Sequence, residues 1–107
     1  MDILIGRNGD SISGKVMEKS LTMRSKLGTL RVDLKRTRWV HFRNPPEFPV
    51  DELWLETGDR LTGTIEGSTI RFRERGGATL EIPHRAIHTM VVNPKLDMKA
   101  AGLGARD

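Results

Sequence analysis

The stretch Asn8-Gly9-Asp10-Ser11-Ile12-Ser13-Gly14 returns 49 positions later as Thr57-Gly58-Asp59-Arg60-Leu61-Thr62-Gly63. Both copies join a turn signal to alternating polar and apolar residues, which is typical of a β-hairpin. Self-similarity at one fixed offset indicates a supersecondary unit that is used twice. The sequence therefore predicts a duplicated unit built from β-strands.

The repeat extends in both directions from this core. Leu4 aligns with Leu53 without a gap, and one extra residue within 74–77 then changes the offset to 50, so that Val40 aligns with Met90. A Gly-rich turn is where a hairpin tolerates such an insertion. The predicted organisation is a first repeat at 1–43, a proline-rich linker at 44–50, a second repeat at 51–93 and a flexible tail at 94–107.

Length and composition limit the size of the core. The chain has 107 residues, of which 36% are hydrophobic and five are Trp or Phe. A repeat of about 40 residues buries too little surface to be stable alone. We therefore expect the two repeats to pack together, or the protein to form a homo-oligomer. The absence of cysteine excludes disulfides and thiolate metal sites.

Localisation follows from what the chain lacks. No stretch is long and apolar enough to span a membrane, and residues 1–7 lack the basic start and apolar run of a signal peptide. The sequence predicts a cytoplasmic protein without a membrane partner. An exported protein whose leader had been removed would have the same sequence.

The glycines of the repeat have two predicted roles. Gly9-Asp10 and Gly58-Asp59 supply residues that a tight turn requires, and each Asp is expected to bond neighbouring backbone N–H groups rather than to act as a catalytic carboxylate. Gly14 and Gly63 fall on the inward side of a strand, where a side chain would crowd a strongly bent strand. They are predicted to mark that bend.

Elsewhere in each repeat the pattern predicts three further strands and one short turn. In the first copy these are 21–23, 30–32 and 39–42, with a single helical or 3₁₀ turn at 34–37. The linker Asn44-Pro45-Pro46-Glu47-Phe48-Pro49 carries three prolines, which favour a stiff, extended connection. We expect it to hold the two repeats at a fixed distance. The alternative is a proline-rich ligand for another domain.

Residues 5–16 and 55–65 resemble the first hairpin of Sm-like and SH3-like small barrels, in which an apolar-x-x-Gly-x-x-apolar-x-Gly-x-apolar run occurs. The repeat is also similar to short barrel repeats of bacterial proteins, which favours a bacterial or phage origin. The resemblance implies an all-β fold of two tandem five-stranded barrels packed together. It also implies assembly through strand edges, which such barrels commonly join into rings. As a hypothesis from geometry alone, a trimer of the chain would present six barrels in a closed ring.

The chain departs from the RNA-binding members of that family. They carry an Asp and an Asn after the bent strand and an Arg-Gly pair near the final strands. Here the corresponding stretches are Met17-Glu18-Lys19-Ser20-Leu21-Thr22 and Glu66-Gly67-Ser68-Thr69-Ile70-Arg71, and the last strands read Trp39-Val40-His41-Phe42 and Thr89-Met90-Val91-Val92. Neither copy keeps the base pocket.

Charge divides the two repeats. Residues 1–43 hold ten Lys/Arg against four Asp/Glu, and residues 44–93 hold five against eight. Opposite net charges would favour head-to-tail association. The alternative is that the basic repeat binds nucleic acid, either RNA or a single strand, through phosphate contacts and one aromatic ring. The residues assigned to that surface are Arg24, Lys26, Arg31, Lys35, Arg36, Arg38 and Trp39.

Catalytic patterns are weak. His84 and His88 lie four apart, as metal ligands on a helix do, but Pro83 limits that segment to one turn and a third ligand is missing. We expect no enzyme activity, no catalytic residue, no metal and no cofactor. The sequence predicts a non-catalytic scaffold or adaptor that self-assembles, with an unidentified protein partner. It leaves open whether the repeats close separately or exchange strands into one larger sheet.

Overall fold

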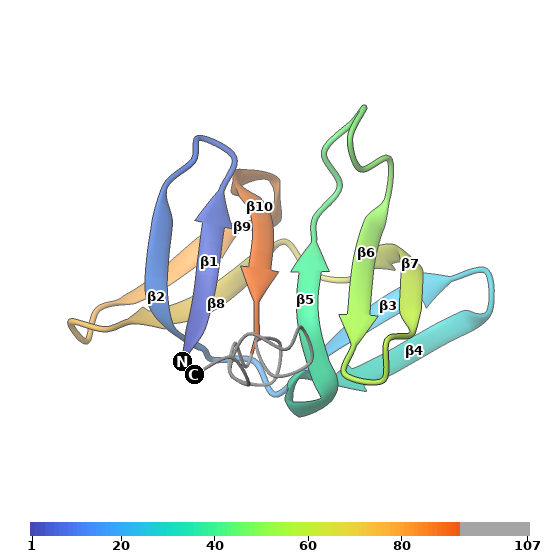
Figure 1. The fold of residues 1–107 in the computed structure, drawn as a ribbon, viewed down its shortest axis with the longest axis horizontal. Helices are drawn as coiled ribbons and strands as arrows, with labels where there is room; N and C mark the ends of the chain where they lie inside the picture. The colour runs from blue at the N-terminus through green and yellow to red at the C-terminus, as the bar shows by residue number, and fades with distance from the viewer. Residues whose placement is uncertain (93–107) are drawn as a thin grey trace, which may run out of the picture.

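The computed structural model describes residues 1–92 (Figure 1). Strands and short turns alternate in the same order in each repeat. The first repeat contains β1 (Asp2–Gly6), β2 (Ser11–Val16), β3 (Ser20–Ser25), β4 (Gly28–Asp33), η1 (Leu34–Arg36) and β5 (Thr37–His41). The second contains β6 (Asp51–Leu55), β7 (Arg60–Ile65), β8 (Thr69–Glu74), β9 (Thr79–Pro83), η2 (His84–Ala86) and β10 (Ile87–Val91). The all-β prediction is confirmed.

Local sequence accounts for these elements. Gly9 and Gly58 have φ angles of 93° and 92°, which favour glycine at the turns after β1 and β6. The β3–β4 connection is a tight turn at Lys26-Leu27, and the 3₁₀ turns lie where the short turns were predicted. Apolar residues alternate toward one face, as the period of two requires. The predicted flexible tail at 94–107 lies outside the described residues.

The ten strands form one sheet in which the repeats exchange strands. Its order is β4-β3-β7-β6-β5-β10-β1-β2-β8-β9. Neither repeat pairs its second strand with its own third strand, because β2 pairs with β8 and β3 pairs with β7. The contiguous half of the sheet is built from residues 20–65, and the split half is built from residues 2–16 and 69–91. The structure thus has strand exchange between the repeats.

A pseudo-twofold axis relates the two halves and passes between β5 and β10. These strands lie side by side and run antiparallel at the centre of Figure 1. Val40 and Met90, which are equivalent in the repeat, pair with each other there. Hydrogen bonds of the connections occur in equivalent pairs as well. Met17 N–H donates to Arg71 C=O and Glu66 N–H donates to Thr22 C=O, both at 2.8 Å.

Strand exchange redistributes the charge of the two repeats. The contiguous half, residues 20–65, contains eight Lys/Arg and six Asp/Glu. The split half, residues 2–16 and 69–91, contains six Lys/Arg and four Asp/Glu. Each half therefore carries a net charge of +2. The opposite net charges of the two repeats therefore do not give one basic half and one acidic half of the sheet.

The core is one cluster that runs through both halves. Fourteen apolar side chains are buried in it, and the largest with almost no exposure include Phe42, Phe72 and Met23. Phe72 comes from β8 in the split half, and Met23 comes from β3 in the contiguous half. Burial of this kind stabilises a fold by roughly 1.5–3 kcal/mol per large side chain. The two halves therefore share one core.

Two buried aspartates lie at equivalent positions of the two repeats, at the first residues of β1 and β6. Asp2 and Asp51 are each 8% exposed. A carboxylate oxygen of Asp2 accepts the N–H of Val16 at 2.9 Å, and a carboxylate oxygen of Asp51 accepts the N–H of Ile65 at 2.8 Å. Val16 and Ile65 are the last residues of β2 and β7, and each of these strands pairs with a strand of the other repeat. The aspartates thus fix the points at which the chain crosses between halves.

Gly14 and Gly63 mark the closest approach of exchanged strands. A Cβ atom at Gly14 would lie 2.0 Å from Arg73 O on β8, and one at Gly63 would lie 2.1 Å from Arg24 O on β3. The prediction that these positions exclude a side chain agrees with this geometry. The crowding backbone belongs to a strand of the other repeat, whereas the prediction placed it within the same one.

The linker is a compact loop, and the expectation of an extended spacer was wrong. Asn44 and Phe48 form an isolated antiparallel bridge, and the Pro45–Pro46 peptide bond is cis. The loop returns the chain so that β6 pairs directly with β5. Because those strands are neighbours in one sheet, the linker joins them without separating the repeats.

Candidate assembly interface

Two strands, β4 and β9, form the open edges of the sheet. Each pairs with one neighbour among the described residues, β4 with β3 and β9 with β8. The last strands of the two repeats, β5 and β10, are not edges, because they pair with each other at the pseudo-twofold axis. Unpaired edge groups are a template for a further strand. Assembly through strand edges would therefore use β4 and β9.

Hydrogen bonds next to each edge show which backbone groups point outward. Leu34 N–H donates to Lys19 C=O at 3.0 Å, and His84 N–H donates to Ser68 C=O at 2.9 Å. These bonds flank the pairs Asp33 with Ser20 and Pro83 with Thr69, so both are non-hydrogen-bonded pairs of an antiparallel ladder. Because such pairs alternate, residues 29, 31 and 33 of β4 direct their backbone polar groups away from β3. Residues 79, 81 and 83 of β9 likewise direct theirs away from β8.

Apolar side chains accompany the outward backbone groups. Leu30 and Val32 on β4 and Ile82 on β9 are partly buried, and Leu80 is 39% exposed. Beside β4 lies a hollow of about 390 Å³, whose lining includes Leu30, Val32 and Leu61. Natural edges are commonly blunted by charge or proline. Here the β4 edge has no proline, and the β9 edge has one at its last residue, Pro83.

The residues predicted to bind nucleic acid fall into four places. Arg24 and Lys26 line a hollow of about 460 Å³ beside β7, together with Arg60 of the second repeat. Arg31 and Arg36 line the hollow beside β4. Lys35 lines a third hollow with Lys15 and Lys19, and Arg38 and Trp39 lie on β5. Three further cations that line these hollows, Lys15, Lys19 and Arg60, were not part of the predicted surface.

Several predicted phosphate contacts already have partners. Arg24 lies 3.7 Å from Glu66, and Arg36 lies 3.9 Å from Glu56. Arg38 donates to the backbone C=O of Glu56 at 3.0 Å. Exposed pairs of this kind are weak and screened by salt, but they reduce the positive potential of the surface.

Trp39 and Trp54 are neighbours on the outer face of β5 and β6. Their ring centroids are 5.7 Å apart, Arg38 lies 5.7 Å from the Trp39 ring and Arg60 lies 5.8 Å from the Trp54 ring. Arg38, Trp39, Trp54 and Arg60 thus form a row of side chains, and the second repeat supplies two of the four. The hairpin turn at 57–59, which sets Trp54 opposite Arg60, was the sequence signal that could have revealed this contact.

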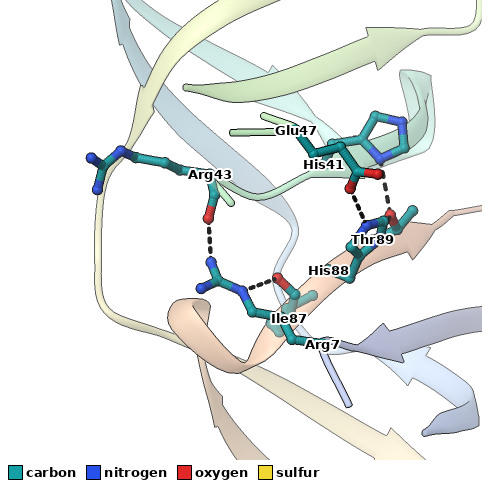
Figure 2. A network of polar contacts seen from close by, with 7 residues as sticks. All are labelled: Arg7, His41, Arg43, Glu47, Ile87, His88 and Thr89. Carbon is teal, nitrogen blue, oxygen red and sulfur yellow. Dashed lines mark hydrogen bonds and ion pairs between the residues drawn. The ribbon is translucent and has the colours of Figure 1, made fainter. Parts of the chain in front are cut away.

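The linker loop packs against the β5–β10 seam (Figure 2). Phe48 stacks on His41 with centroids 4.5 Å apart, and Glu47 Oε1 lies 2.6 Å from His88 Nε2. Thr89 Oγ1 lies within hydrogen-bond distance of both imidazoles, at 2.9 Å from His41 Nδ1 and 2.7 Å from His88 Nδ1. Burial lowers the pKa of His41 below 6.5. These contacts attach the loop to both halves of the sheet.

An arginine also contacts residues at this seam. The guanidinium of Arg7 donates to the backbone C=O groups of Arg43 and Ile87, as Figure 2 shows. Arg7 of the turn after β1 thus connects the residue that follows β5 and Phe42 with the first residue of β10.

The histidines do not form a metal site. His84 packs against Phe42 with ring centroids 4.8 Å apart, and burial lowers its pKa below 6.5, whereas His88 bonds Glu47 and Thr89 at the seam. Within residues 1–92, no group of three or more His, Cys, Asp or Glu side chains is placed to hold a metal ion. The same part of the chain contains no helix long and apolar enough to cross a membrane.

The turn aspartates act locally. Asp10 accepts a hydrogen bond from the side-chain amide of Asn8, and Asp59 accepts one from the hydroxyl of Thr57, both at 2.9 Å. The expected partners were backbone N–H groups, and the observed donors are side chains two residues earlier. Each carboxylate therefore stabilises its own turn.

Comparison of the chain with family models, curated proteins and solved structures finds no match. The resemblance to Sm-like and SH3-like barrels stays a prediction that rests on the quoted residues.

Proposed function

We propose that this protein is a non-catalytic scaffold or adaptor that self-assembles through the two open edges of its sheet. The observation that carries the proposal is the pair of exposed edge strands, β4 and β9, at the two ends of a ten-stranded sheet. Each edge carries outward backbone groups beside apolar side chains. Pairing with another copy would satisfy those groups and bury that apolar surface.

The pseudo-twofold symmetry gives every copy two similar edges. A chain with two assembly sites forms a closed ring if the rotation between copies closes, and a filament if it does not. The Sm-like resemblance favours the ring. Because β5 and β10 pair within the chain, the ring would be joined at β4 and β9.

The test is the absolute mass of the full chain, measured by light scattering on a sizing column over a range of concentrations. We expect a defined multiple of 12.0 kDa. The variant Thr79→Pro removes one outward N–H of β9 without touching the bonds to β8, and it should lower the mass. Thr79→Ala keeps that N–H and serves as the matched control. A monomer at every concentration would refute self-assembly.

A second function is favoured by one specific observation, the row formed by Arg38, Trp39, Trp54 and Arg60. Aromatic rings beside cations are the chemistry that single-stranded nucleic acid requires. The test is a titration with a single-stranded oligonucleotide, followed by tryptophan fluorescence at several salt concentrations. Binding should weaken steeply as salt rises. An unchanged fluorescence signal at low salt would exclude this surface.

A further inference from the structure

We propose that copies associate by antiparallel pairing of β4 of one copy with β9 of the next, centred on Arg31 opposite Glu81 of the second copy. This inference rests on the proposed self-assembly and names its interface. The two strands are equivalent in the repeat and nearly identical in pattern. β4 reads Thr29-Leu30-Arg31-Val32-Asp33, and β9 reads Thr79-Leu80-Glu81-Ile82-Pro83.

The centre of each strand carries opposite charge. Arg31 and Glu81 are both exposed and project from the face of the sheet opposite to the core side. Arg71, which is paired opposite Glu81 on β8, is bonded to Glu18 at 3.4 Å. Glu81 thus remains available to a cation from another copy. Opposite charges directly across a strand pair are favourable, and like charges are unfavourable.

Backbone geometry supports the same register. Arg31 and Glu81 both point their N–H and C=O groups away from their own sheet, so they can form a hydrogen-bonded pair across the new interface. The flanking pairs are then Thr29 with Pro83 and Asp33 with Thr79. Pro83 has no N–H, but its carbonyl can still accept the N–H of Thr29. The centred register therefore uses every outward donor at these six positions, and of the outward acceptors only the C=O of Thr29, which faces Pro83, has no backbone donor.

Apolar side chains match in this register as well. Leu30 lies opposite Ile82 of the second copy, and Val32 lies opposite Leu80. These residues are on the core side of their strands, since Leu30 pairs with Met23 and Leu80 pairs with Phe72, and both Met23 and Phe72 are fully buried. The pairing would extend each core across the interface.

Identical edges repel each other in the equivalent register. Pairing β4 with β4 would place Arg31 opposite a second Arg31, and pairing β9 with β9 would place two copies of Glu81 together. Like charges across a strand pair are destabilising. The charge inversion at this one repeat position therefore selects head-to-tail contacts over a symmetric dimer, and head-to-tail contacts continue into a ring or filament.

The experiment compares four full-length chains by sedimentation velocity at low salt: wild type, Arg31→Glu, Glu81→Arg and the double variant. Each single variant should weaken association by roughly tenfold, because it sets like charges opposite each other. The double variant restores an opposite pair and should recover association. Both positions are exposed, and circular dichroism with thermal unfolding verifies that each variant folds.

A mixture of the two single variants tests the proposed interface most directly. Arg31→Glu has two acidic edges and Glu81→Arg has two basic edges, so an equimolar mixture should assemble although each component alone is weakened. If the wild type associates but neither the single variants nor the mixture behaves differently from it, this interface is wrong while self-assembly stands. If the wild type is a monomer, both the interface and the proposed function fail.

Discussion

Gly14→Ala is expected to destabilise the pairing of β2 with β8. A Cβ atom at this position would lie 2.0 Å from Arg73 O and 2.8 Å from Glu74 Cα, both of which are backbone atoms of β8. Ordinary van der Waals contact begins at 3.4 Å, so β2 and β8 have to separate by about 1.4 Å. A neighbouring bond, from Arg75 N–H to Ser13 C=O, is 3.0 Å long and would be broken by such a movement.

Two costs add to the expected loss in the free energy of unfolding. Overpacking of a close contact costs about 1–3 kcal/mol, and each lost backbone hydrogen bond costs about 1 kcal/mol. We expect the free energy of unfolding to fall by about 3 kcal/mol, which lowers the melting temperature of a domain of this size by roughly 15 °C. The measurement is urea unfolding followed by tryptophan fluorescence and circular dichroism.

Gly76→Ala is the matched control. The nearest atom to its added Cβ is Glu74 Oε1 at 2.6 Å, which is the end of a flexible side chain. That carboxylate can rotate away, so the control should lose less than about 1 kcal/mol. A Gly14→Ala protein that is within about 0.5 kcal/mol of the wild type would refute the close approach of the exchanged strands.

Two further predictions concern the buried Asp51 and the partly buried His84. Asp51→Asn keeps the volume of the side chain, but the carboxylate accepts two backbone N–H groups, whereas an amide can accept with one oxygen only. Unfolding in urea should show that the free energy of unfolding falls by about 2 kcal/mol. An unchanged midpoint would contradict this role. Burial lowers the pKa of His84 in the folded protein below 6.5, so its contribution to stability is complete above about pH 6.5 and is lost as the pH falls toward the lowered pKa. The melting temperature of His84→Gln should therefore depend less on pH between about 5 and 7.5 than that of the wild type, and equal slopes would show that His84 does not contribute.

The sequence predicted the strands, the turns and several residues of the candidate interface, because these depend on local chemistry. The turn glycines Gly9 and Gly58 and the alternation of apolar residues located the hairpins correctly. The linker was misjudged because prolines also fit a tight loop, in which Phe48 packs on His41. Arg60 was missed as a neighbour of the basic hairpin, since it comes from the acidic repeat and lines the same hollow as Arg24 only because β7 pairs with β3.

The sequence by itself determined the strands and turns along the chain and the face of each strand that is buried. These follow from turn chemistry and from the period of two, and both act over a few residues. Tertiary structure alone decided which strands pair across the repeats, and hence the even distribution of charge and the identity of the open edges. The physical reason is that β3 and β8 present almost the same pattern to β2. The choice between them depends on the short crossing at 17–19 and on the shared core, which form only when the whole chain has closed.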